Sequence, residues 1–181
     1  MTVLGDKVLA LHAALDQAGL PHAFGGALAL GWCTRQARGT NDIDLNIFVP
    51  TTAVRWVLKA LPPEVVATEK NAAELRRDGQ SRLSWGATPV DIFLTTDEFH
   101  EHVSTRLSLE PFEGVLVPFL SCTDLAVFKA FFDRRRDWAD IEEMLVARTI
   151  DADAVAAVVA DLLGPEEVRI SKLREIQSEL S

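Results

Sequence analysis

The chain has 181 residues, enough for one domain or for one domain with a helical appendage. Its residues are 48% hydrophobic and 25% charged, which is ordinary for a soluble protein with a buried core. No apolar run reaches the roughly 18 residues that a membrane span needs, and the mixed segment Met1–Leu20 is unlike a signal peptide. The formal net charge of -9 argues mildly against a broad polyanion-binding surface, without excluding a local basic groove.

Hydrophobic periodicity and the positions of glycine and proline predict an α+β fold, a mixed β-sheet flanked by helices with a helical C-terminus. The predicted helices are Asp6–Ala18, Ala27–Trp32, a helix capped by Thr51 or Thr52 that ends at Pro62, Asp97–Val103, a helix from Ser121 or Thr123 to Asp133, Asp137–Arg148, Ala154–Leu163 and Glu166–Leu180. The predicted strands are Leu20–Phe24, Asp42–Val49, Val65–Ala67, Ser81–Trp85, Pro89–Leu94, Leu107–Leu109 and Val115–Phe119. The charged segment Glu69–Gly79 can be a loop or a short helix.

Two features of the composition bear on the cell compartment and on partners. Cys33 and Cys122 are far apart and have no metal-ligand spacing around them, so we expect reduced thiols in a cytoplasmic protein. The dense basic cluster is Arg134–Arg136, and Arg76 with Arg77 forms a smaller one. Such runs are usually solvated helix faces.

Two aspartates open the strand-like run Asp42–Val49, in which polar and apolar residues alternate. Asp42 and Asp44 fall on the same face, about 6.6 Å apart along the strand. Carboxylates this close can share one or two divalent cations, and hard oxygen ligands suit Mg²⁺ or Mn²⁺ held together with substrate phosphate. Asp91 offers a third carboxylate on a similarly patterned strand. The alternative, strongest for Asp91, is that the aspartates only occupy the polar faces of half-buried strands.

Gly25 and Gly26 stand between a short strand and a buried helix. Glycine permits the backbone conformations that expose successive N–H groups, and the N-terminus of the following helix attracts an anion. Adjacent glycines are weak evidence alone, because most form simple tight turns. They gain weight from the aspartates that follow.

Together these residues resemble a known family. Gly-Gly-x-Ala, a short helix, Arg-x-Thr-x-Asp-Ile-Asp-Leu and a distant Val-Asp-Ile-Phe-Leu are similar to the nucleotidyltransferase fold shared with DNA polymerase beta. The resemblance implies that Gly25 and Gly26 hold a nucleoside triphosphate and that Asp42, Asp44 and Asp91 bind two Mg²⁺ ions. Many members carry serine directly after a glycine, but here Ala27 follows Gly26, which leaves the phosphate contact to the backbone.

A later segment resembles the helix pair of abortive-infection type toxin nucleotidyltransferases and their uncharacterised relatives. The pattern is Asp-Leu-x-x-x-Lys ending at Lys129, a basic stretch, and then Asp137-x-x-Asp140. The resemblance covers roughly Leu20–Leu145. It implies a catalytic core over residues 1–120, a helical region over residues 121–181 packed on that core, and a possible antitoxin partner.

Several candidate residues keep two interpretations. Lys129 lies at the edge of an apolar helical arc, so its head should emerge at a rim, where it either neutralises triphosphate charge or only covers the core edge. Asp137 either binds nucleotide or caps a helix. Arg38 and Thr40 either contact phosphate or brace the loop into Asp42, and bracing is the better reading for Thr40.

The sequence therefore predicts a metal-dependent nucleotidyltransferase that moves a nucleoside monophosphate from a nucleoside triphosphate to an acceptor hydroxyl. The acceptor can be a tRNA end, a protein hydroxyl or a small molecule such as an aminoglycoside. A rival hypothesis is a nucleotide-binding or regulatory module of a toxin–antitoxin pair that has no turnover. The retained acidic trio speaks against that rival, because carboxylates that repel one another gain nothing from clustering without a metal.

Overall fold

The computed structural model describes residues 3–180, which form two units. The first unit contains residues 3–28 and 39–120, and the second contains residues 29–38 and 121–180. The second half of helix α2 (Gly26–Thr34) therefore groups with the C-terminal helices. None of the helices in the described part of the chain is long and apolar enough to span a membrane.

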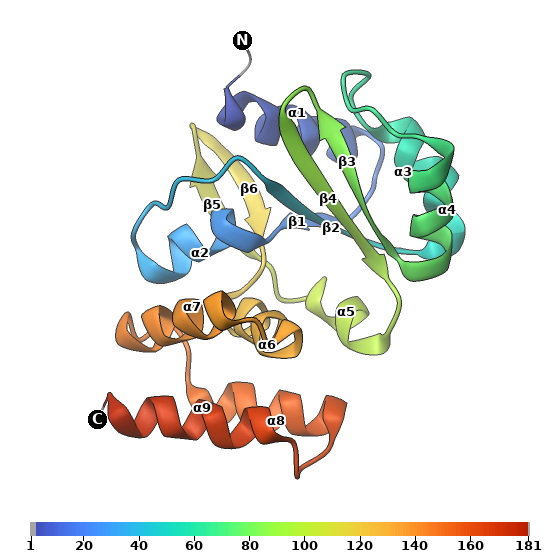
Figure 1. Ribbon diagram of the computed structural model, residues 1–181. Helices are drawn as coiled ribbons and strands as arrows, with labels where there is room; N and C mark the ends of the chain where they lie inside the picture. The colour runs from blue at the N-terminus through green and yellow to red at the C-terminus, as the bar shows by residue number, and fades with distance from the viewer. Residues whose placement is uncertain (1–2, 181) are drawn as a thin grey trace. The chain divides into compact units, whose positions relative to one another are not determined.

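The first unit is built on a mixed sheet of six strands in the order β3-β4-β2-β1-β6-β5 (Figure 1). The strands are β1 (His22–Phe24), β2 (Ile43–Pro50), β3 (Gln80–Trp85), β4 (Thr88–Thr95), β5 (Ser108–Phe112) and β6 (Val115–Phe119). Strand β2 pairs parallel with β4, and β1 pairs parallel with β6, whereas the other neighbours are antiparallel. The predicted α+β class with a mixed sheet is confirmed.

The helices of the first unit follow the predicted order. They are α1 (Leu4–Gln17), the 3-10 turn η1 (Thr51–Ala53), α3 (Val54–Ala60), α4 (Glu69–Asp78) and α5 (Glu98–Val103). The charged segment is a helix, α4, because Thr68 caps its N-terminus and Gly79 ends it in the left-handed conformation. The predicted threonine cap before α3 is wrong: Thr51 begins the turn η1, and the cap position of α3 is Ala53.

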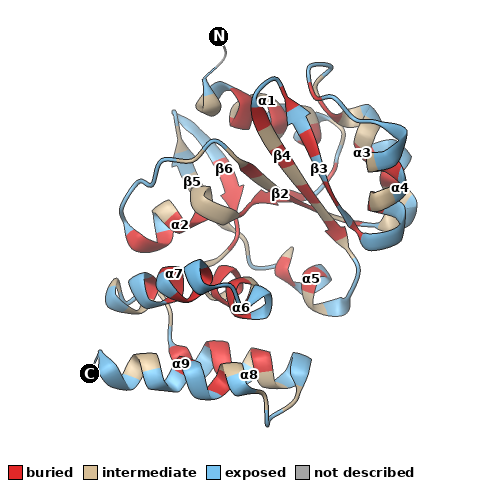
Figure 2. Ribbon diagram, in the orientation of Figure 1, coloured by how far each residue is buried: buried red, intermediate tan, exposed pale blue. Residues whose placement is uncertain are grey.

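Alternation of side chains places the apolar core of this unit mainly against one face of the inner strands. In β4, buried and half-buried residues alternate along the whole strand, and in β2 the apolar residues Ile43, Leu45, Ile47 and Val49 are buried (Figure 2). The half-buried positions between them carry Asp44 and Asp91. The sheet thus holds carboxylates at its surface while burying their neighbours.

The second unit is helical. Besides the end of α2 it contains α6 (Cys122–Phe132), α7 (Arg135–Val146), α8 (Ala152–Leu163) and α9 (Val168–Glu179). Helix α6 packs against α7 and α8, and α9 packs against α7 and α8. Of the two predicted caps of α6, Ser121 is the one present. Helix α7 begins two residues before Asp137, with Arg134 at the cap position, and the Asp137 side chain completes a capping box by accepting from the Arg134 N–H.

The predicted reduced thiols are a further correction. Cys33 and Cys122 are joined by a disulfide, with their Cα atoms 5.5 Å apart. Both residues belong to the second unit, where the disulfide ties the end of α2 to the start of α6. The 89 residues that separate them in sequence conceal this proximity, so spacing alone gave no sign of the pair.

Two histidines are buried in the first unit. His22 lies 2.9 Å from the His12 ring and 2.8 Å from the Leu20 carbonyl. His100 lies 3.1 Å from both the Leu94 carbonyl and the Asn46 side chain. Burial is the largest influence on each ring, and it lowers the pKa of both histidines below the ordinary value.

These lowered pKa values predict that acid destabilises the first unit. Below about pH 6.5 the unfolded chain binds protons that the folded histidines reject, so the free energy of unfolding falls as pH falls. Each group contributes at most about 1.4 kcal/mol per pH unit. Urea titrations between about pH 7 and pH 5 measure this slope. The free energy of unfolding should change less steeply with pH in His22→Asn than in the exposed control His102→Gln. Equal slopes in the two variants would contradict the assignment of the acid sensitivity to the buried histidine.

Candidate functional site

A row of side chains crosses three neighbouring strands of the first unit. On the parallel strands β2 and β4, Asp44 lies directly opposite Asp91, and on the antiparallel pair β3–β4, Arg82 lies directly opposite Asp91. Residues in register on neighbouring strands point to the same face, so Arg82, Asp91 and Asp44 share one face of the sheet. The two carboxylates predicted to act together are therefore brought side by side.

Arg82 is the charged neighbour that the sequence analysis missed. Its Nε and one terminal nitrogen donate to both carboxylate oxygens of Asp91 at 2.7 Å, and it also lies 3.9 Å from the Asp42 carboxylate. The hydrogen bonds from Arg82 to Asp91 are the main reason that the pKa of Arg82 is raised. The alternation of β3, in which Ser81 and Leu83 are buried, was the available signal that Arg82 points toward the aspartate face.

The glycine turn reaches the same row from β1. The Gly25 N–H donates to the Asp44 carbonyl at 2.9 Å. Gly26 has a positive φ of 52°, and a Cβ at this position would overlap the Asp44 carboxylate. Only glycine fits here, because the backbone must approach the carboxylate directly. The predicted grouping of the two glycines with Asp44 is therefore present in the structure.

Asn46 and His100 are buried next to the glycine turn and Asp44. Asn46 is two residues beyond Asp44 on the same face of β2, and it is 5% exposed. Its side chain contacts the ring of His100 on α5 at 3.1 Å, and a Cβ at Gly25 would lie 3.1 Å from its amide nitrogen. The buried Asn46 thus fills the space beneath the turn, a role that the alternating pattern of the strand did not suggest.

The donor set fits a hard divalent cation in its chemistry, although the carboxylates do not converge. Among the described residues, no group of three or more histidine, cysteine or carboxylate side chains is close enough to hold a metal ion. Asp91 turns both oxygens toward Arg82, and the Asp42 side chain is 48% exposed. The Arg82 guanidinium pairs with Asp91 and lies near Asp42, so these carboxylates already stabilise a positive charge. Carboxylate oxygens are also the ligands that a hard divalent cation prefers.

Replacing Gly26 by alanine is expected to destabilise the protein by about 1–3 kcal/mol, because the positive φ and the overlap with Asp44 both oppose a Cβ. Urea unfolding measures this loss. Gly39→Ala is the matched control, since a Cβ there meets nothing within 4 Å. A change in Gly26→Ala no larger than in the control would contradict the close approach.

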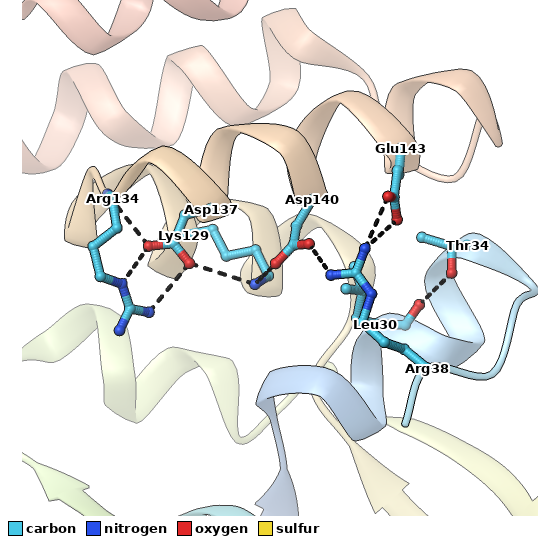
Figure 3. A network of polar contacts seen from close by, with 8 residues as sticks. All are labelled: Leu30, Thr34, Arg38, Lys129, Arg134, Asp137, Asp140 and Glu143. Atoms are coloured by element: carbon cyan, nitrogen blue, oxygen red, sulfur yellow. Dashed lines mark hydrogen bonds and ion pairs between the residues drawn. The ribbon is translucent and has the colours of Figure 1, made fainter. Parts of the chain in front are cut away.

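Except for Thr40, the remaining predicted residues lie in the second unit, in a network of ion pairs (Figure 3). Lys129 donates to Asp140 at 2.6 Å and lies 3.6 Å from Asp137. Arg134 donates to both oxygens of Asp137. Asp137 is fully buried and Lys129 is 8% exposed. The predicted emergence of the Lys129 head at a rim is wrong, because its ammonium group is enclosed by carboxylates.

Arg38 joins the same network. One of its terminal nitrogens donates to Asp140 and the other donates to both carboxylate oxygens of Glu143, at 2.8 and 2.9 Å. In this structure, therefore, Arg38 contacts carboxylates of α7. Thr40 belongs to the first unit, where its hydroxyl accepts from the Asp42 N–H at 3.1 Å. This contact is the bracing role favoured for Thr40.

Asp137 remains ionised inside this network. Burial is the largest influence and opposes the charged form, but the hydrogen bonds from Arg134 and the charge of Lys129 together lower the pKa of Asp137 below its ordinary value. The network is consequently a set of compensated charges: Lys129 and Arg134 oppose Asp137, and Lys129 and Arg38 oppose Asp140.

A family model described as a nucleotidyltransferase of unknown function (DUF6036) matches residues 23–177. This range includes all the candidate residues described above. No curated protein matches the chain significantly.

Solved structures resemble the chain in fold. The solution structure of the antibiotic-resistance factor ANT(2'')-Ia is 18% identical with a TM-score of 0.59, and the match covers 96% of this chain and 94% of that one. A crystal structure of ANT(2'')-Ia with adenylyl-2''-tobramycin is 17% identical with a TM-score of 0.51, covering 97% and 95%. An antigenic nucleotidyltransferase-like protein from Paracoccidioides brasiliensis is 16% identical with a TM-score of 0.53, covering 93% of each chain.

Proposed function

The chain belongs to this family of nucleotidyltransferases of unknown function, and we propose that it moves a nucleoside monophosphate from a nucleoside triphosphate to an acceptor hydroxyl with the help of Mg²⁺ or Mn²⁺. The observation that carries the proposal is the row formed by the glycine turn, Asp44 and Asp91 on one face of the sheet. In the reaction, the acceptor oxygen bonds to the α-phosphorus, the bond to pyrophosphate breaks, and the acceptor proton is lost.

Each residue of the row has a separate task. The triphosphate would lie at the glycine turn, where Gly25 and Gly26 let the backbone approach it and the N-terminus of α2 attracts the anion. The Gly25 N–H itself stays bonded to the Asp44 carbonyl. Asp42 and Asp44 would hold the metal, and Asp91 would share it and accept the proton of the acceptor hydroxyl. A bound divalent ion supplies charge neutralisation on the triphosphate and makes the hydroxyl more acidic. The rest of the rate enhancement comes from holding the two substrates in line.

Arg82 is the protein's own counter-charge for these carboxylates in the proposal. Its guanidinium pairs with Asp91 and lies near Asp42, and a divalent cation held by these carboxylates would compete with it for the same negative charge. Lys129 and Asp137 compensate each other, and Arg38 contacts carboxylates of α7, which supports a structural role for all three in place of triphosphate contact. An assignment of Lys129 to the triphosphate would require it to leave Asp140.

Removing Arg82 should therefore strengthen metal binding to the free protein. In Arg82→Gln, the dissociation constant for Mn²⁺ measured by calorimetry without nucleotide should fall several-fold, because the competing cation is gone. Arg77→Gln is the matched control, since Arg77 makes the same two-pronged contact with Asp78 at the surface. Unchanged or weaker binding in Arg82→Gln would show that Arg82 does not compete with the metal.

The experiment that tests the function is incubation with labelled nucleoside triphosphates and total cell extract, followed by identification of the labelled acceptor. Thermal stabilisation by each of the four triphosphates with Mg²⁺ shows which one binds. Transfer of label to a macromolecule or metabolite supports the proposal. Stabilisation without any transfer would favour a regulatory nucleotide-binding module, and the absence of both would contradict the proposal.

A small molecule such as an aminoglycoside is the second candidate acceptor. It is supported by the fold shared with ANT(2'')-Ia, one structure of which contains adenylyl-2''-tobramycin. A panel of aminoglycosides in the transfer assay distinguishes this acceptor from RNA or protein. The toxin-like role and an antitoxin partner stay predictions that the identity of the acceptor will test.

A further inference from the structure

The junction between α6 and α7 exposes six residues in succession, Phe131 to Arg136. Phe131 is 52% exposed and Phe132 is 43% exposed, although both are large aromatic residues. Their ring centroids lie 6.3 Å apart, with the rings nearly perpendicular. The proposed transfer reaction uses none of these residues, and two neighbouring exposed aromatic rings are costly for a surface that only faces water.

Three arginines follow the aromatic pair, and they differ in their partners. Arg134 bonds to Asp137 and places its guanidinium 4.9 Å from the ring of Phe132. Within residues 3–180, Arg135 and Arg136 have no ion-pair partner, and both are exposed. The junction therefore offers two uncompensated cations beside two aromatic rings.

The acidic residues at the junction do not cancel these cations. Asp137 is buried and bonded to Arg134. Asp133 accepts a hydrogen bond from the Trp138 ring nitrogen and lies 3.8 Å from Arg169 and 3.9 Å from Lys172. Both carboxylates already have cationic partners, so the local surface is positive on a chain whose net charge is -9.

We propose that the junction surface, defined as Phe131, Phe132, Arg135 and Arg136, binds single-stranded nucleic acid. Bases stack on exposed aromatic rings whatever their sequence, while guanidinium groups contact the backbone phosphates. An acidic peptide would use the arginines but would gain nothing specific from the phenylalanine pair. Double-stranded nucleic acid keeps its bases stacked inside the helix and cannot use the rings. The combination of features therefore favours an unpaired strand.

This surface lies wholly in the second unit, and its binding needs neither nucleoside triphosphate nor metal. The inference goes beyond the proposed transfer reaction and can succeed or fail separately from it. If both hold, a single-stranded nucleic acid becomes a candidate acceptor.

The test is fluorescence anisotropy of labelled single-stranded RNA and DNA of about 20 nucleotides, without nucleotide or Mg²⁺. Between about 50 and 200 mM salt, affinity should fall steeply as phosphate contacts are lost. Replacing Phe131 and Phe132 together by alanine should weaken binding about tenfold or more at every salt concentration. Replacing Arg135 and Arg136 together by glutamine should reduce the salt slope by about 1.4, or 0.7 per phosphate contact.

Two controls are available on the first unit. Arg76→Gln with Arg77→Gln removes the smaller arginine pair at the end of α4, and Trp56→Ala removes an aromatic residue that is 48% exposed. Neither should change binding. Tighter binding of RNA than of DNA identifies RNA as the preferred strand, and equal binding still supports the surface.

Absence of binding to both strands would overturn the proposal. Equal losses of affinity in the junction variants and in the control variants would also overturn it. So would a result in which polyglutamate competes as well as RNA and the double alanine variant binds polyglutamate and RNA as tightly as the wild type does. Because the arginine variant leaves the apolar residues intact, it provides a readout even if the double alanine variant folds poorly.

Discussion

Replacing Asp44 by asparagine is expected to reduce nucleotidyl transfer by about a hundred- to a thousand-fold or more, while the protein stays folded. Asp44 lies opposite Asp91 and beside the Gly26 backbone. In the proposal it therefore holds the cation next to the glycine turn that receives the triphosphate. The amide keeps the shape of the carboxylate but removes the charge that holds a divalent cation. The initial rate of label transfer at saturating Mg²⁺ measures the effect.

Asp78→Asn is the matched control for this experiment, because Asp78 also pairs with an arginine but lies at the end of α4. It should leave transfer unchanged. Asp91→Asn should resemble Asp44→Asn in rate. Near-normal transfer in Asp44→Asn, with circular dichroism confirming the fold, would contradict the assignment of the carboxylate row as the site.

Replacing Lys129 by methionine is expected to lower the free energy of unfolding by about 3–5 kcal/mol. The substitution leaves Asp140 and the fully buried Asp137 without the ammonium group that lies 2.6 and 3.6 Å from them. Removal of one partner from a buried ion pair costs more than the pair itself contributes, because the remaining charge stays buried. Urea unfolding followed by circular dichroism measures the loss.

Lys172→Met provides the comparison. Lys172 lies 4.2 Å from the Trp138 ring and 3.9 Å from Asp133, but its side chain is 45% exposed, so about 1 kcal/mol or less is expected. The double variant Lys129→Met with Asp140→Leu should recover part of the lost stability, because the buried carboxylate that loses its ammonium partner is removed. A loss below about 1 kcal/mol in Lys129→Met would contradict the enclosed ion-pair network and would restore Lys129 as a candidate for triphosphate contact.

The backbone of the first unit was largely predictable because its patterns are local. Alternation over β2 and β4 indicates strands, and Gly25 and Gly26 indicate the turn that follows β1. The predictions that failed involve competing local choices. The turn η1 precedes α3 where a threonine cap was expected, and in place of the predicted strand Val65–Ala67, Val66 makes only an isolated bridge to Ser84. Thr68 decided the charged segment in favour of helix α4.

The side-chain partners were less predictable because they depend on contacts distant in sequence. Asp44 and Asp91 could be grouped from their strand positions, whereas Arg82 becomes relevant only once β3 pairs with β4 in register. Lys129 was placed on the correct helix, but its burial depends on Asp140 of the next helix. The disulfide between Cys33 and Cys122 likewise depends on a contact across 89 residues.

The most direct test of the central claim follows the fate of two labels in one nucleoside triphosphate, one at the α-phosphorus and one at the γ-phosphorus. With Mg²⁺ and the acceptor found in cell extract, the wild-type protein should place the α label on the acceptor and release the γ label in pyrophosphate. A chelator or Asp44→Asn should stop both. Transfer of the γ label to the acceptor, or equal transfer by wild type and Asp44→Asn, would contradict nucleotidyl transfer at the carboxylate row.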